Sequence, residues 1–259
     1  NIYPMKKTII FTLILLQIAI VSFTGYKKSI NKENPIVSVS SGDISGSYNN
    51  GIYSFKGIPY AKAERFMPPQ EPDSWKGVRN CTEYGPIAMQ AMNASSEFKM
   101  DEKKSFCVNV WTPGVNDGKK RPVMLWIHGG GFASGAGNME ITWDGAALAR
   151  KGDVVIVSVN HRLNILGFLD LSACGEKYAR SGNVGMLDLV ESLRWINRNI
   201  KNFGGDPGNV TIFGQSGGGG KVGTLLCMPS AKGLFHKAII LSGTLVNIMT
   251  KEKSRAIGT

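Results

Sequence analysis

The stretch of residues 209–220, NVTIFGQSGGGG, constrains the fold of this chain more than any other. A β-branched apolar run leads to Ser216, which has glycines two positions before and after it, and a glycine-rich helix start follows. This GxSxG pattern is typical of a sharp turn from a strand into a helix, in which only small neighbours avoid a clash with the strained serine. The stretch therefore predicts that Ser216 is a nucleophile at the carboxyl edge of a sheet.

A second glycine-rich stretch lies upstream, in residues 122–132, PVMLWIHGGGF. An apolar strand pattern runs straight into His128 and three glycines, and glycines allow backbone amides to turn inward. Acyl transfer places negative charge on the former carbonyl oxygen, and each preorganised N–H donor there contributes on the order of 3 kcal/mol. Either pattern alone can arise by chance in a chain with 32 glycines, but the two in this order form a signature. We therefore predict that residues 128–131, called the oxyanion loop below, stabilise that charge.

These residues resemble the type-B carboxylesterases, the α/β-hydrolase family that includes bacterial carboxylesterases and the cholinesterases. The resemblance covers nearly everything after residue 35 and implies that Ser216 is the nucleophile and that the amides of Gly130, Gly131 and Gly217 are the oxyanion donors. Four further segments carry it: 51–70 (GIYSFKGIPYAKAERFMPPQ), 105–113 (SFCVNVWTP), 160–169 (NHRLNILGFL) and 181–207 (SGNVGMLDLVESLRWINRNIKNFGGDP).

The chain departs from the family pattern on both sides of the serine. The family usually has Glu before it and Ala after it, whereas this chain has Gln215 and Gly217. A neutral Gln215 argues against a site built for cationic, choline-like substrates, while Gly217 still offers its backbone amide. Gln215 and His128 are expected to support the site from beside the reacting groups. Four glycines at a helix start cost about 1 kcal/mol each relative to Ala, so close packing or substrate approach requires them, or they are merely tolerated.

The fold class that these patterns predict is an α/β-hydrolase fold, with a mostly parallel sheet flanked by helices and an antiparallel N-terminal preamble. An Asn-Gly turn predicts a hairpin near residues 41–57, and residues 61–105 lack periodicity and are expected to wall the site. From Cys107 on, strand patterns alternate with helix patterns near residues 144–150, at 184–203 and after Ser216, which predicts an open parallel sheet that includes the strand starting at Cys107. In the 184–203 helix one apolar face recurs at three- and four-residue steps: Met186, Val190, Leu193, Ile196, Ile200 and Phe203. We assign residues 36–259 to the N-terminal part of one such domain, incomplete at its C-terminal end.

The N-terminal residues read as a targeting segment. Lys6 and Lys7 precede an apolar run over residues 8–24, the pattern of a signal peptide, so residues 1–25 predict export to the periplasm or the cell exterior. An uncleaved membrane anchor is the alternative, because no A-x-A cleavage site is present. Residues 26–35 form a basic, polar linker. Without an uncleaved anchor, no stable membrane association is expected.

Charge and cysteine content limit the partners that this chain would take. The formal net charge is +11, but the Lys and Arg residues are scattered, which argues against nucleic-acid binding. No CxxC motif or histidine cluster suggests a metal site, so we expect no metal, no cofactor and a small-molecule ester as partner. Four cysteines allow three pairings. The resemblance implies that the family's usual early disulfide is absent, with Ala88 and Ser105 at its two positions.

The acid and the base of a catalytic triad are the parts that the sequence does not supply. In this fold the order along the chain is Ser, acid, His, yet the 43 residues after Ser216 hold one acidic residue, Glu252, and one histidine, His236. His161 lies on the correct sheet edge but belongs to the NHRL segment, to which the resemblance assigns packing. We therefore expect a chain truncated before its acid and its histidine, and inactive alone. Two function classes stay open: a serine carboxylesterase that is active at full length, and a non-catalytic esterase-like binding or adhesion protein.

Overall fold

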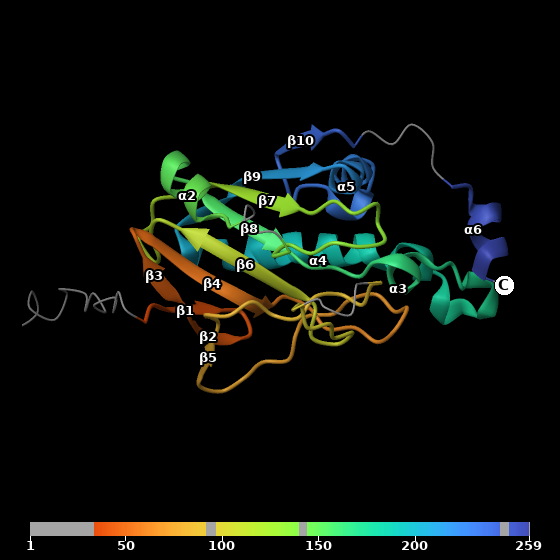
Figure 1. Ribbon diagram of the computed structural model, residues 1–259, viewed down its shortest axis with the longest axis horizontal. Coiled ribbons are helices and arrows are strands. Elements are labelled where there is room, and N and C mark those ends of the chain that lie inside the picture. Colours follow the sequence, from red (N-terminus) through yellow and green to blue (C-terminus); the bar gives the residue numbers. More distant parts are fainter. Residues whose placement is uncertain (1–33, 92–96, 140–143, 244–248, 259) are drawn as a thin grey trace, which may run out of the picture. The chain divides into compact units, whose positions relative to one another are not determined.

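A mixed sheet forms the centre of the protein, and in the residues that the structure describes it has seven strands in the order β10-β9-β7-β8-β6-β4-β3 (Figure 1). The computed structural model describes residues 34–91, 97–139, 144–243 and 249–258, all within one compact unit. The predicted signal peptide, residues 1–25, lies outside the described residues, as does most of the linker. The strands are β3 (Ser47–Asn49), β4 (Ile52–Pro59), β6 (Cys107–Thr112), β7 (Arg121–Ile127), β8 (Val155–Val159), β9 (Gly205–Gln215) and β10 (Lys237–Leu241).

The sheet has a parallel half and an antiparallel half. Strands β10, β9, β7 and β8 are parallel, whereas β6 pairs antiparallel with both β8 and β4, and β4 pairs antiparallel with β3. The prediction that β6 belongs to the parallel run is wrong. Only eight residues, 113–120, connect β6 to β7, which lies on the far side of β8, and a crossover that returns to the starting end of the sheet needs about a dozen residues or more. The short connection therefore forces β6 to run opposite to β7.

The N-terminal preamble is antiparallel, as predicted. Asn50 and Gly51 form the turn between β3 and β4 with φ values of 46° and 84°, which suit an Asn-Gly hairpin. A second, three-stranded sheet contains β1 (Ile36–Val39), β2 (Gly42–Ser45) and β5 (Val78–Asn80). Apart from β5, the described part of residues 61–105 has no helix or named strand. This matches the irregular segment expected there.

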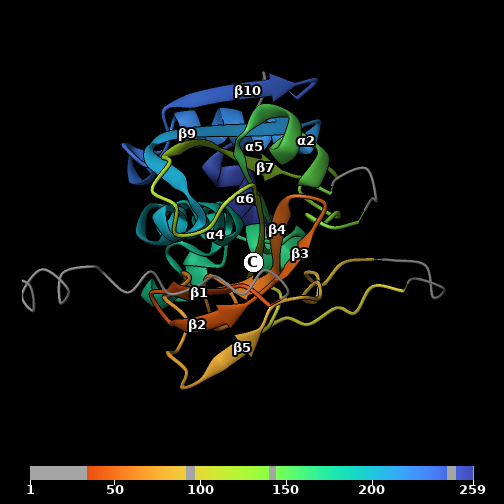
Figure 2. The same ribbon diagram turned by 90° about the vertical axis from the view of Figure 1, so that its left-hand side faces the viewer.

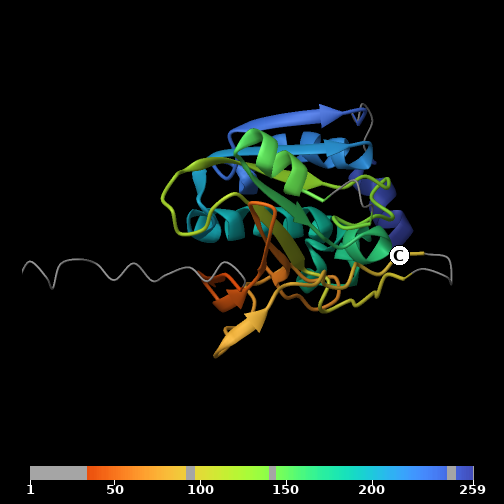
Figure 3. The same cartoon turned by 60° about the vertical axis from the view of Figure 1, so that its left-hand side comes forward.

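Helices cover both faces of the main sheet. Helix α4 (Val184–Asn199) continues into the 3-10 turn η5 (Ile200–Phe203), and all six predicted apolar positions of this segment are buried. Helix α2 (Ala146–Gly152) lies on the opposite face, where Ala149 packs with Ile52, Trp111 and Ile156. Figures 2 and 3 show α2 on one side of the sheet and α4 and α5 on the other. The remaining elements are α3 (Asn164–Phe168), η2 (Ser172–Cys174), η3 (Glu176–Tyr178), η4 (Ser181–Asn183), α5 (Gly217–Leu226), η6 (Pro229–Ala231) and α6 (Lys251–Gly258).

All five residues of β10 are exposed, among them Ile239, Ile240 and Leu241, and within the described chain β10 pairs only with β9. All four cysteines are free thiols; Cys81 and Cys107 are buried. Among the residues that the structure covers, no helix combines the length and the apolar character needed to span a membrane.

A buried ion pair joins α4 to the segment that follows β8. Asp188, on α4, is fully buried and accepts hydrogen bonds from the Arg162 guanidinium at 2.9 and 2.6 Å and from the Arg162 amide at 3.0 Å. The same guanidinium donates to the carbonyl oxygen of Met67 at 2.8 Å. Arg162 therefore holds the irregular segment of residues 61–105 against the helical layer.

Removing one member of this pair should destabilise the protein strongly. Asp188→Ala leaves an uncompensated buried guanidinium, so we expect it to lower the free energy of unfolding by about 3–5 kcal/mol. The matched control is Asp73→Ala, which breaks the exposed pair of Asp73 with Lys62 and should cost less than about 1 kcal/mol. Denaturant unfolding followed by circular dichroism measures both, and equal losses for the two variants would contradict this reading.

Candidate active site

Ser216 stands in a strained turn between β9, which ends at Gln215, and α5, which begins at Gly217. Its φ of 55° and ψ of −125° lie in a region that residues with a side chain rarely adopt. Its amide donates to the carbonyl oxygen of Leu241 at 2.8 Å, and its carbonyl oxygen accepts from the amide of Gly220 at 3.0 Å. The backbone is therefore held on both sides, while the serine itself is exposed.

Close packing explains most of the glycines around Ser216. A Cβ atom on Gly214 would lie 2.7 Å from the carbonyl oxygen of Ile127, and a Cβ on Gly218 would clash with the same oxygen. A Cβ on Gly217 would lie 2.5 Å from the amide nitrogen of Gly131. The turn thus packs directly on the end of β7 and on the oxyanion loop. The sequence left open whether close packing or substrate approach requires the glycines at the helix start; close packing is the reason at Gly217 and Gly218.

The oxyanion loop lies beside Ser216. A Cβ on Gly129 would be 3.5 Å from the Cβ of Ser216, and Gly130 and Gly131 have φ values of 91° and 61°, which glycine adopts without strain. Among the described residues no acceptor is assigned to the amides of Gly130 and Gly131. Gly217 opens α5, and the first amides of a helix have no partner within it. The structure therefore brings Ser216 together with three glycines whose amides are available.

Two anchors of this region were not predicted from the sequence. The side-chain amide of Gln90 clamps Gly135: its Oε1 accepts from the Gly135 amide at 2.7 Å, and its Nε2 donates to the Gly135 carbonyl at 3.0 Å. The backbone amide of Asn164 donates to the carbonyl oxygen of Phe132 at 2.8 Å, and the side-chain amide of Asn164 donates to the backbone carbonyl oxygen of Met89 at 2.7 Å. The predicted wall of residues 61–105 thus holds the segment that follows the oxyanion loop, through Gln90 and through the carbonyl oxygen of Met89.

The chain has three histidines, and the structure shows no hydrogen bond from any of them to Ser216 among the residues it describes. The buried rings of His128 and His161 stack with centroids 4.8 Å apart. Burial, and the nearby Lys221 amine, lower the pKa of His128 to about 3, and the same causes hold the pKa of His161 well below its usual value. His236 accepts a hydrogen bond from the amide of Val210 at 3.1 Å. Val210 precedes Ser216 by six residues of extended strand, a span of about 20 Å.

Lys221 is a buried residue near the site that sequence reasoning overlooked. It lies on α5, has no exposed surface, and donates from Nζ to the carbonyl oxygen of His128 at 3.1 Å. The only signal in the sequence is a charged residue inside an apolar helix start, directly after four glycines.

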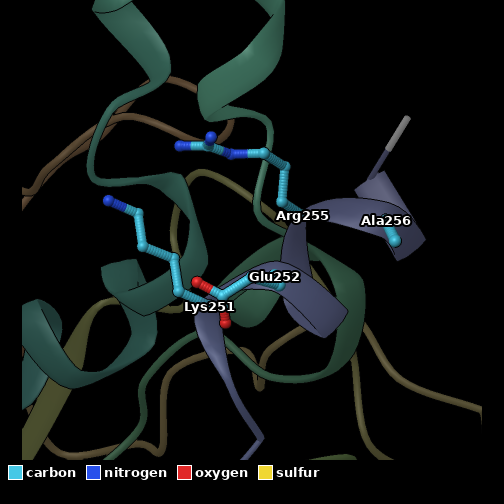
Figure 4. A pocket seen from close by; sticks show the side chains of 4 residues that line it. All are labelled: Lys251, Glu252, Arg255 and Ala256. Carbon is cyan, nitrogen blue, oxygen red and sulfur yellow. The ribbon is translucent and has the colours of Figure 1, made fainter.

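A surface hollow of about 460 Å³ lies elsewhere, on α6, where it is lined by Lys251, Glu252, Arg255 and Ala256 (Figure 4). The side chains of Lys251 and Arg255 extend to the same side of the helix. The hollow contains no predicted site residue, so we do not assign the active site to it.

The chain is similar to known carboxylesterases. A model of the carboxylesterase family matches residues 33–258. The chain is 44% identical to the para-nitrobenzyl esterase of Bacillus subtilis over 85% of its length. It also resembles the structure of an esterase from Clostridium hathewayi that can hydrolyse aliphatic aromatic polyesters (TM-score 0.78, 46% identity, 81% of the chain), and that of a Geobacillus stearothermophilus carboxylesterase (TM-score 0.73, 49% identity, 78% of the chain).

These relatives are about twice as long as this chain. The matches cover 45% of the Bacillus esterase, 43% of the Clostridium esterase and 42% of the Geobacillus enzyme. The matched region still includes the turn at Ser216, the oxyanion loop and the sheet that carries both. The chain therefore belongs to the carboxylesterase family and has its α/β-hydrolase fold.

Proposed function

We propose that the full-length protein, meaning the complete gene product, is a serine carboxylesterase that hydrolyses small carboxylic esters through an acyl-enzyme on Ser216. The observation that carries this proposal is the strained, exposed Ser216 beside three available amides. Strain of this kind costs about 1–3 kcal/mol and persists where the surrounding structure enforces it, often as part of a mechanism. A protein that used this fold only for binding would need neither the strained serine nor the amides.

The chemistry follows from this geometry. The Ser216 Oγ attacks the ester carbonyl carbon and transfers its proton to a base, and the negative charge moves to the carbonyl oxygen. The amides of Gly130, Gly131 and Gly217 donate to that oxygen. When the carbonyl re-forms, the alcohol leaves with a proton and the acyl group remains on Ser216, until a water molecule attacks it and releases the acid. The base is a group that the three histidines of this chain do not supply.

An acyl-enzyme predicts a kinetic signature in the full-length protein. When deacylation is slower than acylation, p-nitrophenyl acetate should give a burst of p-nitrophenol equal to one molecule per active site, followed by steady turnover. Stopped-flow absorbance measures the burst. A protein that hydrolyses no carboxylic ester under these conditions would refute the proposed function.

The neutral residue before Ser216 predicts the substrate charge preference. Gln215 is exposed at the turn and carries no charge, so acetylcholine should have no advantage over its neutral isostere, 3,3-dimethylbutyl acetate. We expect the two kcat/KM values to agree within about tenfold, which is 1.4 kcal/mol. A preference of about a hundredfold for the choline ester would show that other acidic groups line the site.

We also propose that the protein is exported and acts without nucleic acid or cofactor. The support is the sequence alone: Lys6 and Lys7 precede an apolar run, and the basic residues are scattered rather than clustered. Fractionation of the native host tests export, and an uncleaved N-terminal segment would instead leave the protein with the membrane.

A further inference from the structure

Lys221 is placed where a lysine is costly. Its side chain is completely buried, and a buried ammonium loses its hydration unless a charged partner compensates. No carboxylate among the described residues pairs with it; its contacts are the carbonyl oxygen of His128 at 3.1 Å and the face of the Phe132 ring, 5.2 Å from Nζ to the centroid. A residue of this kind, kept at a cost in stability, points to a role in function.

The two contacts of Lys221 fall on the two ends of the oxyanion loop. His128 is the first residue of the loop, and Phe132 directly follows it. Lys221 itself lies on α5, five residues after Ser216. The amine therefore connects the loop that carries Gly130 and Gly131 to the helix that carries Ser216 and Gly217.

The loop is held to the residues that follow it, because the carbonyl oxygen of Gly130 accepts hydrogen bonds from the amides of Ala133 and Ser134, both at 3.0 Å, but neither bond reaches α5. Gly129, Gly130 and Gly131 have no side chains, and the bonds made by Gln90 and Asn164 fix positions from Phe132 onward. At the near end, the Nζ of Lys221 is the side-chain donor to the His128 carbonyl. Without it, the peptide that precedes the glycines would still pack against the start of α5 but would lose its side-chain hydrogen bond to that helix.

We propose that Lys221 is a positioning residue, which ties the oxyanion loop to the helix of Ser216 so that the amides of Gly130, Gly131 and Gly217 converge on one oxygen. This inference rests on the proposed function. Lys221 acts through the backbone of His128 and does not touch the ester. Either the amine or the ammonium form can donate this hydrogen bond.

The same position makes the protein's stability depend on pH. Burial lowers the pKa of Lys221 from its usual value to about 7, so between pH 7 and about 10.4 the unfolded chain binds a proton that the folded chain does not. Stability rises with pH wherever the unfolded state binds more protons. The destabilising effect of Lys221 is therefore complete at or below pH 7 and fades as the pH approaches 10. The titratable groups that face it, His128 and His161, have lowered pKa values and change charge only below this window.

The test is Lys221→Met in the full-length protein, because methionine is similarly long and unbranched but cannot donate a hydrogen bond. We expect kcat for p-nitrophenyl acetate to fall by at least about tenfold, with KM nearly unchanged. The loss should stay below the roughly 10²–10³-fold that follows deletion of an oxyanion donor, because Lys221 only positions the donors. We expect Tm at pH 7 to rise, and the difference in Tm between variant and wild type to shrink towards pH 10. Lys232→Met, at an exposed lysine, is the control and should change neither quantity.

Lys221→Met is expected to lower kcat but to raise Tm, and this combination separates a positioning role from a purely structural one. A Lys221→Met protein with wild-type kcat would overturn the inference, and so would a variant that loses stability and activity together. In the first case Ser216→Ala still abolishes hydrolysis, so the proposed function stands. A wild-type protein without esterase activity would refute the proposed function and this inference with it.

Discussion

Ser216→Ala in the full-length protein is expected to lower kcat/KM for a p-nitrophenyl ester by about 10⁴-fold or more, because the variant has no oxygen that can accept the acyl group. The amides of Gly130, Gly131 and Gly217 remain, so the residual rate should still exceed that of the reaction in water. Circular dichroism should show an unchanged fold, since the Ser216 side chain is exposed. Steady-state assays of the variant and the wild type measure the effect.

A matched control separates the loss of the nucleophile from general effects of substitution. Ser38→Ala changes an exposed serine on β1, in the smaller sheet, and should leave kcat/KM unchanged. If Ser216→Ala kept the wild-type rate, the assignment of the nucleophile would be wrong whatever the control showed.

The chain of residues 1–259 on its own should show no measurable ester turnover. His128 and His161 are buried and stacked, and His236 is hydrogen-bonded to the amide of Val210 in the middle of β9, six residues before Ser216. Without a base the Ser216 hydroxyl stays protonated at neutral pH. The exposed apolar strand β10 should also make this chain prone to self-association. Assays beside the full-length protein, with size-exclusion chromatography, measure both effects; normal turnover by a monodisperse chain would contradict them.

Features that depend on neighbouring residues were predictable from the sequence. The Asn50-Gly51 turn, the apolar face of α4 and the sharp turn at Ser216 each follow from local spacing, and the structure contains all three. The strand preceding the oxyanion loop belongs to this group too, because an apolar run followed by three glycines needs no distant partner. These elements were enough to indicate the family.

Features that depend on distant partners were not predictable. Gln90 clamps Gly135 across 45 residues, and Lys221 reaches His128 across 93. Neither pair leaves a periodic pattern in the sequence, because each contact exists only once the sheet has brought the segments together. The direction of β6 is a different case: the eight-residue connection to β7 carried the signal, but the alternation of strands and helices suggested a parallel strand.

The central claim is that Ser216 is the acyl-forming nucleophile, and covalent labelling tests it most directly. The full-length protein is incubated with a fluorophosphonate probe, digested, and analysed by mass spectrometry for the modified peptide. We predict one adduct per chain, located on Ser216, formed in parallel with the loss of esterase activity and absent from Ser216→Ala. Labelling at another residue, or full loss of activity with Ser216 unmodified, would contradict the claim.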